Sequence, residues 1–203
     1  YKEANFYLDG IKKFQSKYGG KVMPTVDKID AEIAYNKYDI FKNLYYLYML
    51  AGVLMLAFTI VNIFYERKSI RVIINIFHIV IGCFFALHTI GLIARWYISG
   101  HAPWSDAYES MIYVAWATMF FGLAFGKDSK LTVASTAFVT SMILMIAHWN
   151  WMDPSIGNLQ PVLNSYWLMI HVAVIVGSYG PFTLAMVLGL IALFLMIFTT
   201  DKN

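Results

Sequence analysis

The sequence predicts an all-α polytopic membrane protein, in which a bundle of transmembrane helices follows a short outward-facing N-terminal segment. Of the 203 residues, 60% are hydrophobic and only 13% are charged, whereas soluble domains are roughly half apolar and a quarter charged. The mean hydropathy is +0.61. The apolar residues are also gathered in long stretches, and about 20 such residues suffice to cross a bilayer as a helix.

Residues 1–43 differ in composition from the rest of the chain. They carry eight lysines and six acids, with helix breakers at Gly19, Gly20 and Pro24. We expect this segment to be the end of an extracytoplasmic (periplasmic) domain, because charged side chains are costly inside a bilayer. A helical periodicity that starts at Asp27 predicts a helix that continues into the membrane.

The remaining residues, 44–203, are expected to form a transmembrane bundle of five helices. The predicted spans are residues 44–64, 72–97, 107–125, 131–147 and 167–198. In the last span, Gly177 and Gly180 permit close helix packing. Pro181 permits a kink there, because proline cannot donate a backbone hydrogen bond.

The basic residues of the connecting loops predict the orientation. Cytoplasmic loops of membrane proteins are enriched in Lys and Arg, and one side of this chain carries nearly all of them. Among lysines and arginines, the loops on the opposite side contain only Arg95, at the end of its span. The N-terminal segment and most of the tryptophans are therefore expected to face outward. The basic residues that mark the cytoplasmic side are Arg67, Lys68, Arg71, Lys127, Lys130 and Lys202.

The last span contains a single histidine, His171, and no acid, lysine or arginine. Asn164, His171 and Ser178 are spaced by seven residues, so they share one helix face. We expect the His171 ring to point into a bundle or cavity, where an ionisable side chain within a membrane is a functional candidate by default. The alternative is a packing histidine that is hydrogen-bonded to a neighbouring helix.

Two further histidines, His78 and His88, lie on the second span, roughly 15 Å apart along the helix. Each is either a packing residue or a contact for a ligand in transit. Their depths do not match that of His171, which disfavours an electron carrier of the cytochrome b type.

The loop between the second and third spans predicts a capped helix start. Pro103 ends the incoming helix, Asp106 is placed to cap the next one, and Glu109 completes an arrangement like a capping box. Both carboxylates also suit the positive end of the helix dipole. The same loop could form the floor of a site.

A methionine and histidine pattern offers a second metal chemistry. Met142, Met145 and His148 recur at three-residue spacing, with Met152 beyond. Thioethers and imidazole suit Cu(I), although methionine more commonly fills a helix interface.

Other chemistries find little support in the sequence. Cys83 is the only cysteine, so this chain alone forms no disulfide, CxxC redox pair or thiolate metal site. The net charge of +3 lies outside the apolar spans and indicates topology rather than nucleic-acid binding. No nucleophile motif, phosphate loop or intramembrane carboxylate pair is present.

Two segments of the sequence are distinctive: ALHTIGLIARWYISGHAPWSDAYESMIYVAWA at 86–117 and LQPVLNSYWLMIHVAVIVGSYG at 159–180. Both closely resemble the CcsA family of cytochrome c biogenesis proteins. Residues 23–50 resemble the join between the CcsB and CcsA portions of fused CcsBA proteins. The family's WWD motif is absent, because HWNWMDP at 148–154 precedes the His171 helix instead of following it. We therefore expect the sequence to be part of a longer protein.

The resemblance implies a heme exporter and holocytochrome c synthase (a cytochrome c heme-lyase) in the bacterial cytoplasmic (inner) membrane. Heme b would be held at the periplasmic face for thioether attachment to the CxxCH motif of apocytochrome c. The family's external axial histidine lies in an LMIHV run that matches His171, so His171 is expected to bind the heme iron. Additional heme contacts are expected from Trp104, Trp151, Trp167, Ser178 and His88.

The expected partners are the lipid bilayer, apocytochrome c, and either the remainder of the same polypeptide or a CcsB-like protein, with no nucleic acid. This segment alone is expected to be inactive. The alternative function is a non-catalytic heme or copper membrane transporter or binding subunit. The sequence leaves open the second axial ligand, the heme entry path and redox state, and the oligomeric state.

Overall fold

The computed structural model describes residues 2–20, 23–149, 152–159, 161 and 164–198, and this part of the chain is helical without strands. The seven helices that it contains are α1 (Lys2–Tyr18), α2 (Val26–Tyr38), α3 (Ile40–Phe64), α4 (Lys68–Ser99), α5 (Ala107–Phe125), α6 (Lys130–Ala147) and α7 (Tyr166–Phe198). The predicted all-α class is confirmed.

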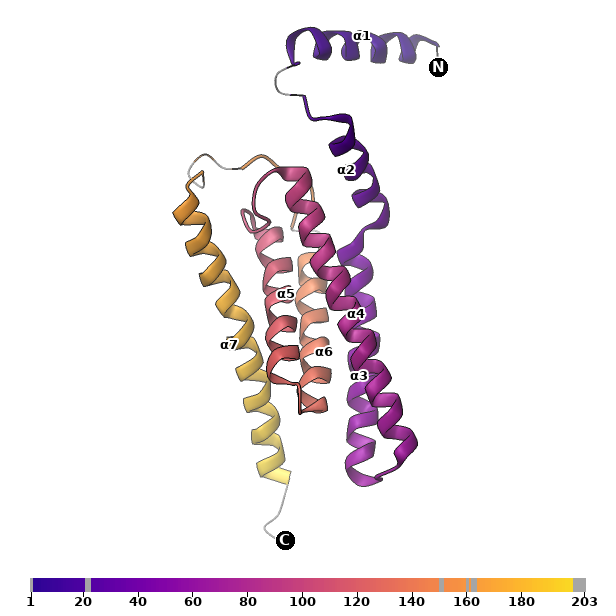
Figure 1. Cartoon of the computed structure of the whole chain (residues 1–203), viewed down its shortest axis with the longest axis vertical. Coiled ribbons are helices and arrows are strands. Elements are labelled where there is room, and N and C mark those ends of the chain that lie inside the picture. The colour runs from indigo at the N-terminus through magenta and orange to yellow at the C-terminus, as the bar shows by residue number, and fades with distance from the viewer. Residues whose placement is uncertain (1, 21–22, 150–151, 160, 162–163, 199–203) are drawn as a thin grey trace.

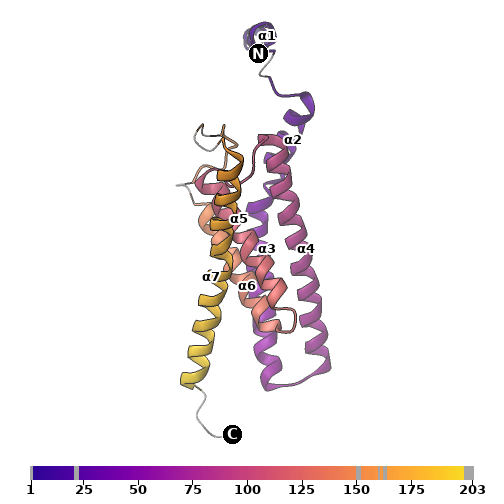
Figure 2. The same ribbon diagram turned by 60° about the vertical axis from the view of Figure 1, so that its left-hand side comes forward.

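Helices α3 to α7 lie side by side and alternate in direction, while α1 lies across one end of the molecule (Figure 1). The turned view in Figure 2 shows α7 alongside α5, at the opposite edge of the bundle from α4. The main helix pairs are α3 with α4 and α6, and α5 with α6 and α7. The centre of the bundle is therefore built by α3, α5 and α6.

Small residues allow these helices to approach closely. A side chain at Gly52 of α3 would meet the backbone nitrogen of Phe138 in α6 at 2.8 Å. In α6, hydroxyl-bearing residues replace bulky ones in the interior, and Thr136 donates to the carbonyl of Thr132 at 2.7 Å. Such residues are common between membrane helices, because they combine close packing with satisfied polar groups. The buried hydroxyl residues of α6 are Thr132, Ser135, Thr136, Thr140 and Ser141.

The predicted spans agree with the helices to within four residues at each end. The helix predicted to run from Asp27 into the membrane corresponds to α2 and α3, which together form the helical segment Val26–Phe64, with a break at Asp39. This residue has φ 40° and ψ 57°, a left-handed conformation. Asp tolerates that conformation better than most residues other than glycine. The break separates α2 from α3.

Four helical segments of the described chain are long and apolar enough to cross a membrane: Val26–Phe64, Lys68–Ser99, Lys130–Ala147 and Tyr166–Phe194. The prediction counted five spans, and the difference is α5. This helix has the predicted bounds 107–125 and lies within the bundle. Its tyrosines, threonine, serine and glutamate reduce its hydropathy. Glu109 is paired with Arg95 of α4, and Thr118 donates to the carbonyl of Val114 in its own helix.

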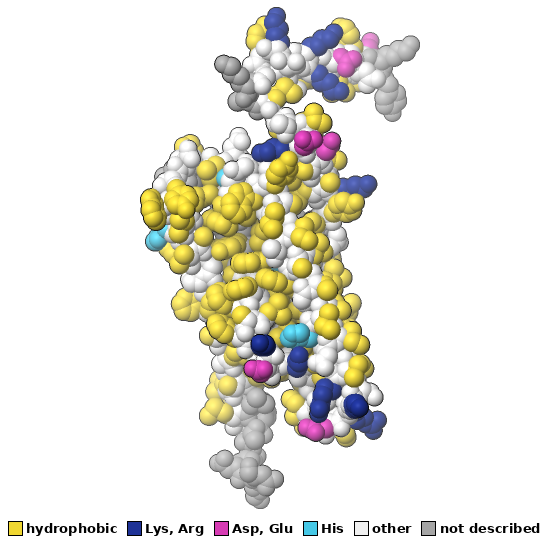
Figure 3. Space-filling view, in the orientation of Figure 1, with side chains coloured by type: hydrophobic (Ala, Val, Ile, Leu, Met, Phe, Trp, Pro, Cys, Tyr) yellow, Lys and Arg dark blue, Asp and Glu magenta, His cyan; other side chains and the backbone are white. Residues whose placement is uncertain are grey.

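Lysine and arginine gather at the end of the bundle where α3 meets α4 and α5 meets α6 (Figure 3). Arg67, Arg71 and Lys127 at this end are exposed. The distribution follows the pattern from which we predicted the cytoplasmic side, and the orientation itself remains a prediction.

The contact between α5 and α7 supplies a test of the packing. A side chain on Gly180 would meet the backbone of Ala117 and Thr118 at 2.8 Å, whereas one on Gly189 would meet nothing within 4 Å. We expect Gly180→Ala to lower the free energy of unfolding by about 1–3 kcal/mol, because backbone atoms cannot move aside cheaply. Thermal unfolding in detergent measures this, and Gly189→Ala on the same helix is the matched control. Equal stability of the two variants would contradict the close packing of α7.

Candidate functional site

His171 lies on α7 five residues after the start of the helix, and its side chain is exposed. Gly180, which packs against α5, follows nine residues later. Nine residues correspond to about 900°, or half a turn from the starting direction, so His171 points away from α5. The described residues offer its ring no hydrogen-bond partner. The expectation that the ring lies inside a bundle is therefore not met by the helices of this chain.

The other predicted contacts on and near α7 are also at the surface. Ser178 donates to the carbonyl of Ile175 at 2.6 Å, which satisfies its hydroxyl within the helix. Trp167 is 77% exposed, and Asn164 is exposed just before α7. Trp151 lies outside the described residues. His171 and Asn164 are therefore the members of the polar stripe whose side chains have no hydrogen-bond partner in the described chain, and of these two only His171 lies within α7.

Trp104 contacts α7 at the level of His171. Its Nε1 donates to the carbonyl of Met169 at 3.1 Å. Its ring packs against Trp96 at 6.1 Å and against Tyr113 at 4.9 Å between centroids. Trp104 and its neighbours line a small apolar groove of about 140 Å³ between α4 and α5. Trp104 therefore links α7 to the other helices, and its N–H group is not free for a ligand.

His88 is fully buried between α3, α4 and α5. Its Nε2 lies 3.1 Å from the carbonyl of Ile112, and its ring meets those of Phe41 and Tyr48 with centroids 5.4 and 6.2 Å away. The core encloses the ring on these sides, which favours the packing interpretation over a heme contact.

His148 forms the link between α6 and the break at Asp39. Its Nε2 lies 3.5 Å from the Asp39 carboxylate, and its Nδ1 lies 3.3 Å from the carbonyl of Leu144. Both ring nitrogens have partners, so neither is free to bind copper beside Met142 and Met145.

A polar cluster is centred on Arg95, which is fully buried near the end of α4. Its Nε donates to Glu109 at 2.7 Å, and its terminal nitrogens donate to the carbonyls of Pro154 and Ser155, both at 2.9 Å. The hydroxyl of Tyr35 lies 3.4 Å from Nη1. A guanidinium tolerates burial when its charge is paired and its N–H groups are bonded. Arg95 thereby joins α2, α4, α5 and the segment that precedes α7.

Glu109 is held in place from its other side. Its Oε2 accepts hydrogen bonds from the backbone N–H of Ser105 at 2.8 Å and from the Ser105 hydroxyl at 2.6 Å. Asp106 caps α5 by accepting from the Glu109 backbone at 2.7 Å. The predicted cap is confirmed, except that Glu109 reaches back to Ser105 instead of Asp106. Partial burial raises the pKa of Asp106, and the hydrogen bond from Glu109 opposes this effect.

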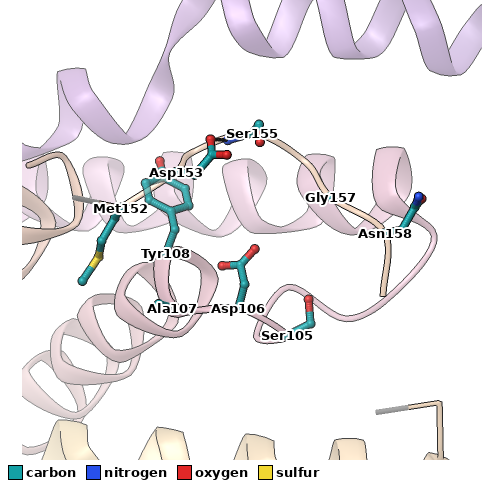
Figure 4. Close-up of a pocket in the computed structure, with 9 residues that line it drawn as sticks. All are labelled: Ser105, Asp106, Ala107, Tyr108, Met152, Asp153, Ser155, Gly157 and Asn158. Carbon is teal, nitrogen blue, oxygen red and sulfur yellow. Dashed lines mark hydrogen bonds between the residues drawn. The ribbon is translucent and has the colours of Figure 1, made fainter. Parts of the chain in front are cut away.

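A cavity of about 330 Å³ opens beside this cluster, between the start of α5 and residues 152–158 (Figure 4). Asp106 and Tyr108 line it from α5, while Asp153 and Ser155 line it from the facing segment. Hydrogen bonds from Ser155 lower the pKa of the Asp153 carboxylate. Two carboxylates repel the anionic propionates of heme, so this cavity is not a seat for heme.

Sequence reasoning identified Asp106 and Glu109 but missed the role of Arg95. The available signal was a single arginine at the outer end of an apolar span, followed fourteen residues later by a glutamate at a helix start. Such an arginine is as readily interpreted as a surface residue. Only the structure shows that it is 0% exposed.

The pairing of Arg95 with Glu109 is open to a direct test. Glu109→Gln removes the charge that compensates a buried guanidinium, and breaking such a pair typically costs about 3–5 kcal/mol. We expect a corresponding loss of thermal stability in detergent. The exposed carboxylate Asp128, in the loop between α5 and α6, supplies the control Asp128→Asn, for which little change is expected. Stability of Glu109→Gln equal to that of the control would show that the pair contributes nothing.

Known proteins match the part of the chain that contains this site. The family described as Cytochrome C assembly protein matches residues 104–203, which include both Trp104 and His171. Protein NrfI of Wolinella succinogenes is 40% identical over 190 residues, covering 94% of this chain and 21% of that protein.

Proteins named cytochrome c biogenesis protein CcsA are also similar to the chain. The one from Prochlorococcus marinus subsp. pastoris is 30% identical over 154 residues, covering 71% of this chain and 48% of that protein. The one from Prochlorococcus marinus strain MIT 9301 is 28% identical over 169 residues, covering 76% of this chain and 52% of that protein. The chain thus spans about a fifth of NrfI and about half of these CcsA proteins. The chain is a relative of the CcsA family of cytochrome c biogenesis proteins.

Proposed function

We propose that this chain holds heme b at the outer face of the bacterial inner membrane, for attachment to the CxxCH motif of apocytochrome c. His171 is the proposed axial ligand of the heme iron. The observation that carries the proposal is the state of this ring: it is exposed on the face of α7 that it shares with Ser178, without a hydrogen-bond partner among the described residues. A polar ring within a membrane is costly unless something satisfies it.

The chemistry of an exposed imidazole fits this role. A neutral ring nitrogen is a good ligand for heme iron, and the helix holds it at a defined depth. The histidine of the CxxCH motif can replace one axial ligand as the product forms. Each thiol then adds across a heme vinyl group, with sulfur bonding to one carbon and hydrogen to the other. In this scheme the protein contributes mainly by positioning the reactants.

The second axial ligand is proposed to come from the remainder of the polypeptide or from a CcsB-like partner. Two features support this assignment. His171 points away from the described bundle, and the rings of His88 and His148 face other parts of it: His88 Nε2 lies 3.1 Å from the carbonyl of Ile112 in the core, where its Nδ1 has no partner, and His148 Nε2 lies 3.5 Å from Asp39. On this basis the segment alone is expected to bind heme weakly and to be inactive.

The ligand role predicts a spectroscopic change. In the complete polypeptide purified from membranes, we expect His171→Ala to lose most of its bound heme, and added imidazole to restore the reduced visible spectrum. Leu190→Ala, on the same helix but deeper in the membrane, is the control and should retain heme. Unchanged heme content in His171→Ala would reject His171 as a ligand.

A reporter protein distinguishes covalent heme attachment from transport. The alternative function, a heme or copper transporter or binding subunit, requires no thioether bonds. We expect co-expression with an apocytochrome carrying CxxCH to give heme that stays on the reporter in a denaturing gel, and a reporter with both cysteines replaced by serine to give none. If heme binds but the CxxCH reporter stays unlabelled, the transport alternative is favoured.

A further inference from the structure

Three side chains between residues 95 and 104 contact either α7 itself or the segment that leads into it. Arg95 donates to the carbonyls of Pro154 and Ser155 at 2.9 Å. The other two contacts come from the loop after α4. His101 Nε2 lies 3.3 Å from the carbonyl of Gly157, and Trp104 donates to the carbonyl of Met169 at 3.1 Å.

We infer that these contacts set the position of His171 at the outer end of α7: Trp104 acts on the first turn of the helix itself, and Arg95 acts on residues 154 and 155 of the segment before it. The inference rests on the proposed function of His171 as a heme ligand. It adds a residue that does not touch heme but acts through the chain that carries the ligand.

Arg95 is suited to such a role because its own position is fixed. The guanidinium is fully buried and is oriented by Glu109 at 2.7 Å, which is in turn bonded twice to Ser105. The carbonyls that it bonds belong to irregular backbone, which has no helix partners of its own. A planar fork of donors can hold two successive carbonyls at once, whereas a lysine cannot.

The outer end of α7 depends on these contacts more than the rest of the helix does. The buried residues of α7 are Gly180 and Leu184, both deeper than His171. Met169 lies two residues before His171, so the bond from Trp104 acts within one turn of the ligand. Groups that orient a metal ligand typically change metal affinity by about 10–100-fold when removed.

The test compares heme retention in the complete polypeptide. We expect Arg95→Gln to retain heme about ten-fold less tightly than the unaltered protein, and added imidazole to restore the visible spectrum. Restoration distinguishes positioning from structural damage, because a small ligand can replace a misplaced ring but cannot rebuild a collapsed site. Arg71→Gln, at the opposite end of the same helix and exposed, is the matched control and should behave like the unaltered protein.

Two results would overturn the inference: unchanged heme retention in Arg95→Gln, or a loss that imidazole does not restore. If Arg95→Gln fails to accumulate, Trp104→Phe decides the matter. It keeps an aromatic ring but removes the donor to Met169, and a smaller loss restored by imidazole is expected, while no loss would count against the inference. Measuring His171→Ala in parallel distinguishes the proposed function of His171 from the positioning role of Arg95. If it loses heme while Arg95→Gln does not, the proposed function stands and only the positioning role fails.

Discussion

The burial of Arg95 constrains the end of the bundle at which α4 ends and α5 begins. A guanidinium without solvent needs a counter-charge and acceptors for its N–H groups, and here these come from three separate parts of the chain. Glu109 of α5 supplies the charge, Tyr35 of α2 lies beside it, and two carbonyls come from the segment before α7. Removing any one of these partners would leave the buried guanidinium of Arg95 with an unpaired charge or an unbonded N–H group. The cluster therefore holds these elements together.

The position of α7 follows from two different kinds of contact. Deeper in the membrane, Gly180 lets the helix approach the backbone of α5, and this packing directs His171 to the opposite side. At the outer end, the hydrogen bond from Trp104 to Met169 holds the first turn of the helix. The two contacts together present an unsatisfied imidazole at a fixed depth, on a face that the described helices leave open. The proposed role of His171 as a heme ligand would require such a rigid placement of the ring.

Much of the fold was predictable because long apolar stretches identify membrane helices directly from a sequence. Long apolar stretches separated by charged loops gave the bounds of α5 without error, and the Asp106 cap was readable from residue type and spacing. The break at Asp39 was not, because the surrounding residues keep a helical periodicity and only the backbone conformation interrupts it. Of the five predicted spans, α5 is the one that composition alone does not identify as apolar enough to cross a membrane, because polar residues lower its hydropathy, so its assignment as a span remains a prediction.

By itself, the sequence determined the helical class, the approximate spans and the choice of His171 as the notable residue of α7. These features depend on local composition and spacing, which can be determined from the sequence without knowledge of the fold. The tertiary structure alone decided that Arg95 is buried and paired, that His88 packs in the core, and that His171 faces away from α5. Burial and orientation depend on which helices meet, and residues far apart in the chain, such as Arg95 and Ser155, become partners only when the bundle has assembled.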